Sequence, residues 1–217
     1  MVEGYARRTG YAGSRNYIAV VPTVGCVNEI ARRIAESLEN ARPMLHHQGC
    51  CQLPTDVRAV TNVLTGVCRN PNVAAVVLVS LGCESVNAED IVQSVAPEKP
   101  VELVRVQAMG GITVATDRGI EAARKLARSL RVDRAPVSLS ELVIGIKCGA
   151  SDTTSGLASN TAVGAAADML LDAGATVVFG ETTEIIGAEH ILVRRAPTPD
   201  GEARLLERGR AMETPAE

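Results

Sequence analysis

Seven consecutive apolar residues, Val73 to Val79, constrain the fold of this chain more than any other segment. A strand with one solvated face alternates apolar and polar residues, whereas a strand covered on both faces is apolar throughout. Asn70-Pro71-Asn72 breaks the chain just before this run. We therefore expect Val73–Val79 to be a central strand of a parallel sheet with helices on both faces.

The rest of the chain alternates between strand and helix patterns. Tyr17–Val21 is rich in β-formers, and after a glycine turn apolar residues recur at helical spacing from Val27 to Leu38. Further strands are predicted at 44–46, 101–106, 142–146 and 176–179, and further helices at about 55–67, 88–95, 113–130 and 161–171. This order predicts an α/β fold, an open, mostly parallel, doubly wound (Rossmann-like) three-layer arrangement that two subdomains can share.

The charged segment 131–140, which contains Pro136, is predicted to connect the two subdomains. The expected organisation is a central α/β domain over residues 1–135 and a second α/β section over 136–196. Residues 197–217 are polar and are predicted to form a flexible tail.

Composition excludes several classes of protein. With 46% apolar and 2% aromatic residues, the core must be built from Val, Ile, Leu and Ala, which favours α/β layers. A net charge of −3 without a basic stripe argues against a nucleic-acid partner. No segment is long enough for a bilayer and no signal peptide is recognisable, so we expect a cytoplasmic protein without a membrane partner. Its six cysteines are then expected to be free, metal-bound or catalytic rather than paired.

Short runs of chemically unusual residues follow six of the predicted strands. In an open parallel sheet, ligands bind in the crevice outside the carboxyl ends of the strands, so polar residues gathered there predict one shared site. The sequence therefore predicts an enzyme. The runs are residues 25–28, 46–51, 82–84, 107–111, 147–152 and 181–184.

Four of the six cysteines each follow a different predicted strand within these runs, Cys26, Cys50, Cys83 and Cys148, and Cys51 adjoins Cys50. No CxxC pair is present, which argues against a zinc ribbon. Three thiolates from separate loops could hold iron or an iron–sulfur cluster. Free cysteine is also among the most buried residue types, so each could equally be a small apolar residue beside a glycine turn.

Groups suited to proton transfer lie in the same runs. Neighbouring residues of a strand point to opposite faces, so only one of His46 and His47 is expected to reach the crevice, where it could move a proton or ligate a metal. The alternative is a structural histidine. Abstraction of a proton α to a carboxylate needs a base and a stabilising cation, and the candidates are Glu84, Lys147, Asp152, Glu181, Glu184 and Glu189. Residues 109–113 and 151–156 precede helices and could present N–H groups to an anion, although such residues also make ordinary helix starts.

Taken together, these motifs resemble the altronate/galactarate dehydratase family of sugar-acid hydro-lyases, which includes the large subunit of sulfolactate sulfo-lyase. The most specific stretches are Lys147–Gly156 with Asn160, and Glu181–His190. Also similar, in the same order, are Gly4–Tyr17, Pro22–Asn28, His46–Cys50, Leu81–Glu84, and Gln107 with Gly110–Thr113. Local departures from the family pattern are Ala150, Thr161 and the extra thiol of Cys51.

The resemblance implies metal-assisted β-elimination of water from a sugar acid such as altronate or galactarate, with sulfite release from sulfolactate as the alternative. It implies Fe²⁺, or another divalent ion such as Mn²⁺, with a [4Fe–4S] cluster as the alternative. The implied catalytic residues are His46, Lys147 and Glu184, and the implied metal ligands are Cys50, Cys83, Glu84 and Cys148. Substrate contacts are implied for Asn28, Gln107, Gly110, Gly111, Thr113, Ser151, Asp152, Ser155, Asn160 and Glu181.

Two parts of the family's usual architecture, a small β-rich N-terminal module and a C-terminal portion, have no counterpart in these residues. We therefore expect either a small β-rich partner subunit or the remaining C-terminal portion to complete the site, and a homo-oligomer. The alternative from another class is a non-catalytic subunit that keeps the family fold.

Overall fold

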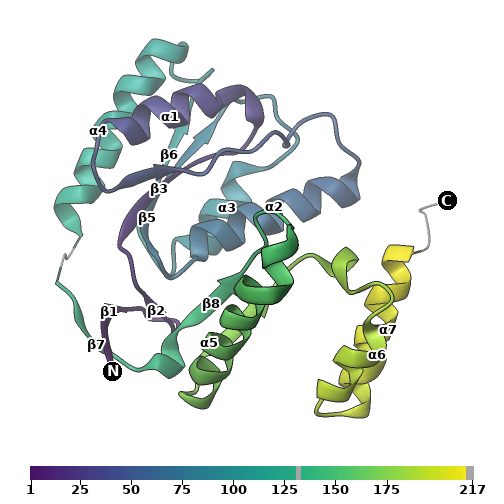
Figure 1. Ribbon diagram of the computed structural model, residues 1–217. Coiled ribbons are helices and arrows are strands. Elements are labelled where there is room, and N and C mark those ends of the chain that lie inside the picture. The colour runs from purple at the N-terminus through teal and green to yellow at the C-terminus, as the bar shows by residue number, and fades with distance from the viewer. Residues whose placement is uncertain (131–132, 214–217) are drawn as a thin grey trace. The chain divides into compact units, whose positions relative to one another are not determined.

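The computed structural model describes residues 1–130 and 133–213, which form two compact units, Met1–Leu142 and Val143–Glu217 (Figure 1). The division lies after Leu142 rather than at the expected 135/136 boundary. The reason is that β7 (Ala135–Val137) pairs antiparallel with β1 (Val2–Ala6) and so belongs to the first unit.

The first unit is built on a four-stranded, fully parallel sheet in the order β4-β3-β5-β6. Its strands are β3 (Tyr17–Pro22), β4 (Ala41–Pro43), β5 (Val73–Ser80) and β6 (Val101–Arg105). Its helices are α1 (Asn28–Glu36), α2 (Pro54–Arg69), α3 (Ala88–Val95) and α4 (Ile112–Ser129). A small antiparallel sheet adds β2 (Ala12–Gly13), in the order β2-β1-β7.

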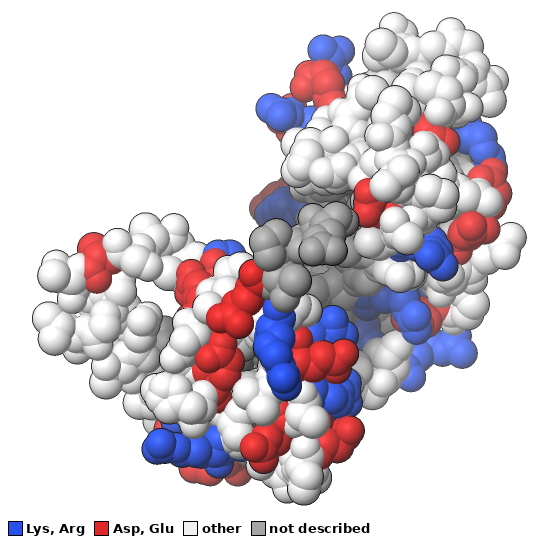
Figure 2. Space-filling view, turned by 90° about the vertical axis from the view of Figure 1, so that its right-hand side faces the viewer, with Lys and Arg blue, Asp and Glu red and all other residues white. Residues whose placement is uncertain are grey.

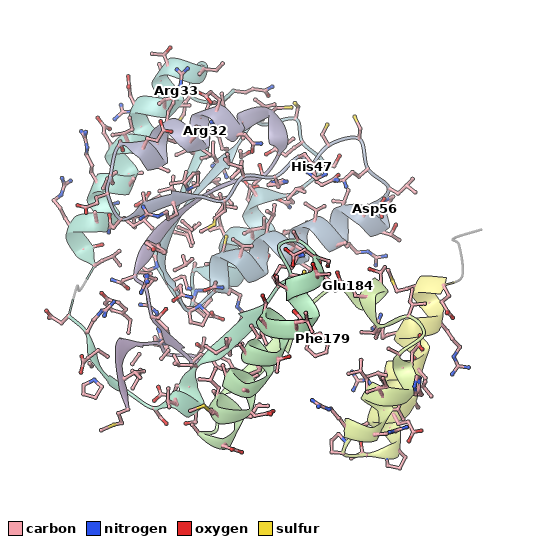
Figure 3. All side chains as sticks on the ribbon, viewed as in Figure 1. Arg32, Arg33, His47, Asp56, Phe179 and Glu184 are labelled. Carbon is pink, nitrogen blue, oxygen red and sulfur yellow. The ribbon has the colours of Figure 1, made fainter. Side chains whose placement is uncertain are left out.

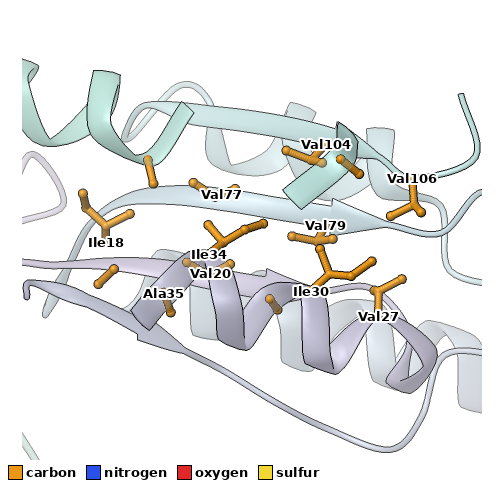
Figure 4. Packing of buried hydrophobic residues seen from close by; sticks show 14 of the residues in the cluster. Ile18, Val20, Val27, Ile30, Ile34, Ala35, Val77, Val79, Val104 and Val106 are labelled. Carbon is orange, nitrogen blue, oxygen red and sulfur yellow. The ribbon is translucent and has the colours of Figure 1, made fainter. Parts of the chain in front are cut away.

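Strand β5 is the centre of this unit, as its apolar run predicts. All eight of its residues are buried, and its side chains alternate between two separate apolar clusters. Val77 and Val79 pack with residues of α1 and α4 on one face (Figure 4), and Val76 and Leu78 pack with residues of α2 and α3 on the other. The predicted three-layer Rossmann-like fold is confirmed.

The strand predicted at 44–46 is found instead at Ala41–Pro43. Its register explains the shift, because Ala41 lies opposite Ile18 and Pro43 opposite Val20 in the parallel pair. The Met44 N–H still donates to Val20 O, at 2.9 Å, so the chain leaves the sheet only after Met44.

In its described residues, the second unit contains a two-stranded parallel sheet and three α-helices. The strands are β8 (Val143–Ile146) and β9 (Thr176–Phe179), and the helices are α5 (Asn160–Asp172), α6 (Glu189–Leu192) and α7 (Pro199–Glu213). Short 3₁₀ segments cover Thr182–Ile185 and Val193–Arg195.

Helix α7 occupies most of the segment that was predicted to be a flexible polar tail. Residues 199–213 are thus helical and not irregular, residues 214–217 lie outside the described part, and the flexibility of this segment stays a prediction. The helix starts with Pro199 in its first turn, and the Gly201 N–H donates to Thr198 Oγ1 at 3.1 Å. Acidic residues in the first turn and Arg210 in the last suit the helix dipole.

Charges of both signs are interspersed with uncharged residues over the face drawn in Figure 2. In the described residues, no helix is long and apolar enough to cross a membrane.

Candidate functional site

The parallel sheet of the first unit brings four of the six predicted runs to one edge. Because β3, β4, β5 and β6 run in the same direction, the loops that follow them all leave from their carboxyl ends. The chain winds from β3 outward to β4 and then returns to the other side as β5. The carboxyl ends of β3 and β5 therefore flank the topological switch point, where open α/β sheets bind ligands.

Thr23 and Glu84 link the two loops at this switch point. Thr23 is fully buried, and its hydroxyl donates to Glu84 Oε1 at 2.5 Å. The Glu84 carboxylate also accepts the Leu81 N–H at 3.2 Å and the Gly82 N–H at 2.6 Å. Burial opposes ionisation of Glu84, but the hydrogen bonds from Thr23, Ser80 and the Gly82 backbone outweigh it and lower the pKa of this carboxyl. Both oxygens of Glu84 thus hold the loop after β5.

Close approach of the β4 loop to Thr23 requires glycine at position 49. Gly49 has a φ of +109°, and a Cβ there would lie 2.2 Å from Thr23 O. This contact places the adjacent Cys50 beside the loop that follows β3.

His46 has both ring nitrogens within hydrogen-bond distance of the backbone. Nε2 lies 2.8 Å from Pro22 O and Nδ1 accepts the Gln48 N–H at 3.2 Å, a pairing that suits the neutral ring with its proton on Nε2. The neighbouring His47 is exposed and extends from the loop after β4 (Figure 3). Both histidines lie in the loop after β4 and not in a strand, so strand alternation does not orient them, and His47 is the one that lines a pocket.

That pocket, of about 320 Å³, lies between the loops after β3 and β4. Asn28 lines it at the start of α1 and donates from Nδ2 to His46 O at 2.8 Å. Its Oδ1 is buried and has no hydrogen-bond partner among the described residues. A buried amide oxygen of this kind needs a donor. The other lining residues are Val24, Gly25, Cys26, His47, Gln48 and Cys50.

Exposed thiols surround the same edge. Cys26, Cys50, Cys51 and Cys83 are all free and exposed, whereas Cys68 is buried in the core. Cys50 Sγ and Cys51 Sγ lie 3.6 Å apart, and this hydrogen bond raises the pKa of the Cys51 thiol. The residues that the structure describes contain no group of three Cys, His, Asp or Glu side chains arranged to hold a metal ion.

The loop after β6 carries the predicted anion-binding turn. Gly110 and Gly111 have φ values of +86° and +121°, and the Gly111 N–H donates to Val106 O at 3.0 Å. Helix α4 follows directly, with Thr113 exposed in its first turn. Gln107 precedes the turn and packs over Gly82 of the β5 loop, since a Cβ on Gly82 would lie 2.8 Å from Gln107 Oε1.

Predicted site residues also lie close together in the second unit. The parallel pair β8 and β9 ends at one edge, where a pocket of about 470 Å³ opens. Sequence reasoning missed five of its lining residues, because polar-run patterns do not mark them: Ile146, Ser159, Val163, Phe179 and Gly180. The predicted residues that line it are Lys147, Cys148, Ser151, Ser155, Asn160, Glu181 and Glu184.

Lys147 and Glu181 form an ion pair across the ends of these two strands. The hydrogen bond between them raises the pKa of Lys147 and lowers the pKa of Glu181. Glu181 also accepts the Cys148 N–H at 3.3 Å and holds a left-handed backbone conformation with a φ of +66°. Such a conformation in a non-glycine residue is strained and is typical of functional sites. Glu184 lies one turn further on, in the segment Thr182–Ile185 (Figure 3).

Asp152 faces its own loop instead of the pocket. Its Oδ1 accepts the Thr154 N–H at 2.7 Å and the Thr154 hydroxyl at 2.6 Å, and these bonds lower the pKa of the carboxyl. A π-helical turn over Ser155–Ser159 then leads into α5, and such turns are frequent at functional sites. The substrate-contact role predicted for Asp152 remains a prediction.

Two family descriptions cover almost the whole chain. Residues 4–131 match D-galactarate dehydratase/Altronate hydrolase, second domain. Residues 139–217 match D-galactarate/Altronate dehydratase, C-terminal.

Curated relatives are identical to this chain at about one residue in three. Altronate dehydratase of Bacillus subtilis (strain 168) is 33% identical over 207 residues, which is 89% of this chain and 41% of the relative. Galactarate dehydratase (L-threo-forming) of Escherichia coli (strain K12) is 32% identical, over 94% and 43% of the two chains. The (2R)-sulfolactate sulfo-lyase subunit beta of Chromohalobacter salexigens is 34% identical, over 93% and 51%. The chain thus spans about half the length, or less, of these relatives.

Proposed function

Since the chain belongs to the D-galactarate dehydratase/altronate hydrolase family, we propose that it carries much of the active site of a sugar-acid hydro-lyase. The observation that carries the proposal is the pocket at the ends of β8 and β9. Seven residues that the resemblance singles out, including Lys147, Glu181 and Glu184, line it together. Altronate and galactarate are the proposed substrates because relatives are named for them.

The proposed reaction is elimination of water from a 2,3-dihydroxy acid. A base removes the proton from the carbon α to the carboxylate, and that electron pair forms the carbon–carbon double bond. The bond from the β-carbon to its hydroxyl breaks, and the hydroxyl takes up a proton and leaves as water. The resulting enol then tautomerises to a 2-keto acid.

The pocket of the second unit supplies suitable groups for these steps. Lys147 carries a positive charge that can stabilise the enediolate that forms when the α-proton leaves. Glu184 offers a carboxylate for the proton transfer. The hydroxyls of Ser151 and Ser155 and the Asn160 amide can bond substrate hydroxyls.

The pocket of the first unit suits the same substrate class. The Oδ1 atom of Asn28 is buried without a partner, and a substrate hydroxyl can donate to it. His47 lines this pocket with an exposed imidazole and is a further candidate for proton transfer. The candidates for proton transfer at this edge thus include His47 beside His46, whose ring nitrogens are both close to backbone atoms.

The proposed metal does not fit the donors of either unit by itself. Cys50, Cys83 and Glu84 belong to the first unit and Cys148 to the second, and no triad of donors is found among the described residues. The Glu84 oxygens are already occupied by the loop. Fe²⁺, Mn²⁺ or a [4Fe–4S] cluster in the assembled enzyme remains a proposal, which anaerobic metal and acid-labile sulfide analysis tests.

The first test is a keto-acid assay with the full chain, together with any chain that copurifies with it, on a panel of aldonates and aldarates with added Fe²⁺. Glu184→Gln should lower kcat by about 10² or more, the usual contribution of a general acid or base. Glu202→Gln, an exposed carboxylate on α7, is the matched control and should leave kcat unchanged. Absence of keto acid with every substrate, or normal turnover in Glu184→Gln, would contradict the proposal.

Sulfite release is the second candidate function, favoured by the 34% identity to the sulfo-lyase subunit over 93% of this chain. Incubation with sulfolactate and measurement of sulfite tests it. Sulfite without keto-acid formation from any sugar acid would replace the hydro-lyase proposal.

Because the sulfo-lyase relative is one subunit of its enzyme, we also propose a partner chain for this protein. A small β-rich subunit, or the portion of the relatives that this chain does not span, would complete the active site, and copies of the chain would assemble into a homo-oligomer. A cytoplasmic location is also proposed, because six free thiols suit a reducing compartment.

A further inference from the structure

A second pocket of the first unit lies at the amino ends of its strands, opposite the edge that carries the candidate site. It has a volume of about 180 Å³ and is lined by the turn after β1, by the first residues of β5 and by the residues just before β6. A water molecule occupies about 30 Å³ in the liquid, so this space can hold a small organic molecule. Neither the proposed reaction nor the family motifs at the carboxyl edge use it.

Positive charge dominates the lining of this pocket. Arg7, Arg8, Arg69 and Lys99 face one carboxylate, that of Glu98. Arg69 and Glu98 form an ion pair, which leaves three cations in excess. Guanidinium groups are the preferred partners of phosphate oxygens.

Two of these cations are held in place by backbone carbonyls. Arg7 donates from Nε to Pro71 O at 2.7 Å and from Nη2 to Asn16 Oδ1 at 2.8 Å. Lys99 donates from Nζ to Asn70 O at 2.9 Å and Val73 O at 2.8 Å, so one of its three hydrogens is left for a ligand. Burial, with a further contribution from Arg7, lowers the pKa of Lys99 to about 8. A bound anion would relieve this cost.

Glu98 places a second requirement on a ligand of this pocket. Its side chain is 17% exposed, and its Oε2 is buried without a hydrogen-bond partner among the described residues. A buried carboxylate oxygen without a donor is costly. Because an anion cannot supply that donor unless it also carries a hydroxyl or amino group, Glu98 restricts the class of ligand.

We propose that this pocket is a second binding site, which takes a small hydroxylated phosphate monoester such as a short sugar phosphate. The phosphate contacts Arg8 and Lys99, and a hydroxyl of the same molecule donates to Glu98 Oε2. The site is independent of the proposed lyase reaction, so its test does not depend on turnover.

The test is isothermal titration calorimetry of the full chain at constant ionic strength with three probes, glycerol 3-phosphate, inorganic phosphate and glycerate. Glycerol 3-phosphate should bind more tightly than inorganic phosphate, which lacks the carbon-bound hydroxyl, and than glycerate, which carries a single charge. An equal affinity for glycerate would overturn the assignment to a phosphate.

Two variants change the charge of the pocket lining in opposite directions. Arg8→Gln removes an exposed cation that donates to Pro97 O at 3.2 Å, and it should weaken the binding of both phosphates about tenfold, the usual effect of one charge-assisted hydrogen bond. Glu98→Gln removes the carboxylate that the described lining contributes, so inorganic phosphate should bind more tightly and the advantage of glycerol 3-phosphate should disappear.

The matched control is Arg32→Gln, an exposed arginine of α1 paired with Glu29 at 3.7 Å and outside the pocket. It should leave all three affinities unchanged, and unchanged urea midpoints should show that every variant is folded. No binding of either phosphate to the wild-type chain, or equal losses in Arg8→Gln and Arg32→Gln, would overturn the proposal.

Discussion

The two units of this chain use the same parallel strand arrangement but bury very different amounts of apolar surface. In the first unit, helices cover both faces of the sheet and two apolar clusters separate its layers. In the second, Ala175 is the one buried apolar residue among those described. Leu157 is 83% exposed there, Met169 74% and Phe179 62%. Parallel sheets are normally covered on both faces, so the first unit can be stable from its own core while the second is expected to be weakly stable.

The two units also differ in how their polar residues at the strand ends are used. At the carboxyl edge of the first unit, Glu84 and His46 form hydrogen bonds with backbone atoms of the unit's own loops. The second unit gathers more of the predicted site residues in one pocket, on a scaffold with little core. We expect stability to respond to substitutions in the first unit and turnover to respond to substitutions in the second.

The largest expected effect compares one buried and one exposed leucine. Leu78→Ala in β5 should lower the free energy of unfolding of the first unit by about 2–5 kcal/mol, because it leaves a cavity between the sheet and its helices. Leu157→Ala in the second unit should change stability by less than about 0.5 kcal/mol. Amide hydrogen exchange, read separately for β5 and for α5, measures both, and similar losses in the two variants would break the comparison.

A smaller effect is expected from two glycines. Gly49→Ala should destabilise the first unit by about 1–3 kcal/mol, because φ is +109° there and a Cβ would collide with Thr23 O. Gly164→Ala in α5 should stabilise the second unit by about 0.5–1 kcal/mol, because a Cβ there meets nothing within 4 Å and alanine favours a helix. Urea unfolding of both variants against the wild-type chain tests the opposite signs, and a stabilising Gly49→Ala would refute the close packing of the β4 loop.

The smallest effect concerns the pH dependence of two lysines. Burial lowers the pKa of Lys99 from 10.5 to about 8 in the folded state. Between these pH values the unfolded chain binds more protons at Lys99, so this residue makes stability rise with pH from about 8 to 10.5. Glu181 raises the pKa of Lys147 above 10.5. The stability that this ion pair contributes is therefore fully present below pH 10.5 and is lost only as pH rises through the pKa of folded Lys147.

Unfolding of Lys99→Met and Lys147→Met, each subtracted from wild type across pH 7 to 10, separates the two cases. The difference curve should slope for Lys99→Met and stay flat for Lys147→Met. Two flat curves would show that Lys99 is as well solvated as Lys147.

Much of the fold could be predicted because its signals are local. The helix at Ala88–Val95 and the strand at Thr176–Phe179 lie where the sequence patterns place them. The shifted strand at Ala41–Pro43 was harder, because its pairing with β3 rather than its own residues defines it. Helix α7 was missed because charged residues dominate its composition and Pro197 and Pro199 lie at its start, although Thr198 and Pro199 form a recognisable helix start.

The candidate site divides in the same way. Strand order in the chain was enough to predict that the runs after β3, β4, β5 and β6 share an edge. Alternation along a strand predicted that only one of the two histidines reaches the crevice, but not which one. In the structure both histidines lie in the loop after β4, where the His46 ring contacts Pro22 O and accepts the Gln48 N–H, and His47 lines the pocket.

By itself, the sequence determined the α/β class, the central strand, the family and the residues at the strand ends, because hydrophobic periodicity and motif spacing are properties of the chain. Only the tertiary structure decided which of these side chains are engaged by their own loops, as Glu84 is, and which line pockets, as Glu184 does. It alone brought Arg7, Arg69 and Lys99 around one cavity. The physical reason is that burial and hydrogen bonding depend on neighbours that are distant in sequence, and no local pattern records them.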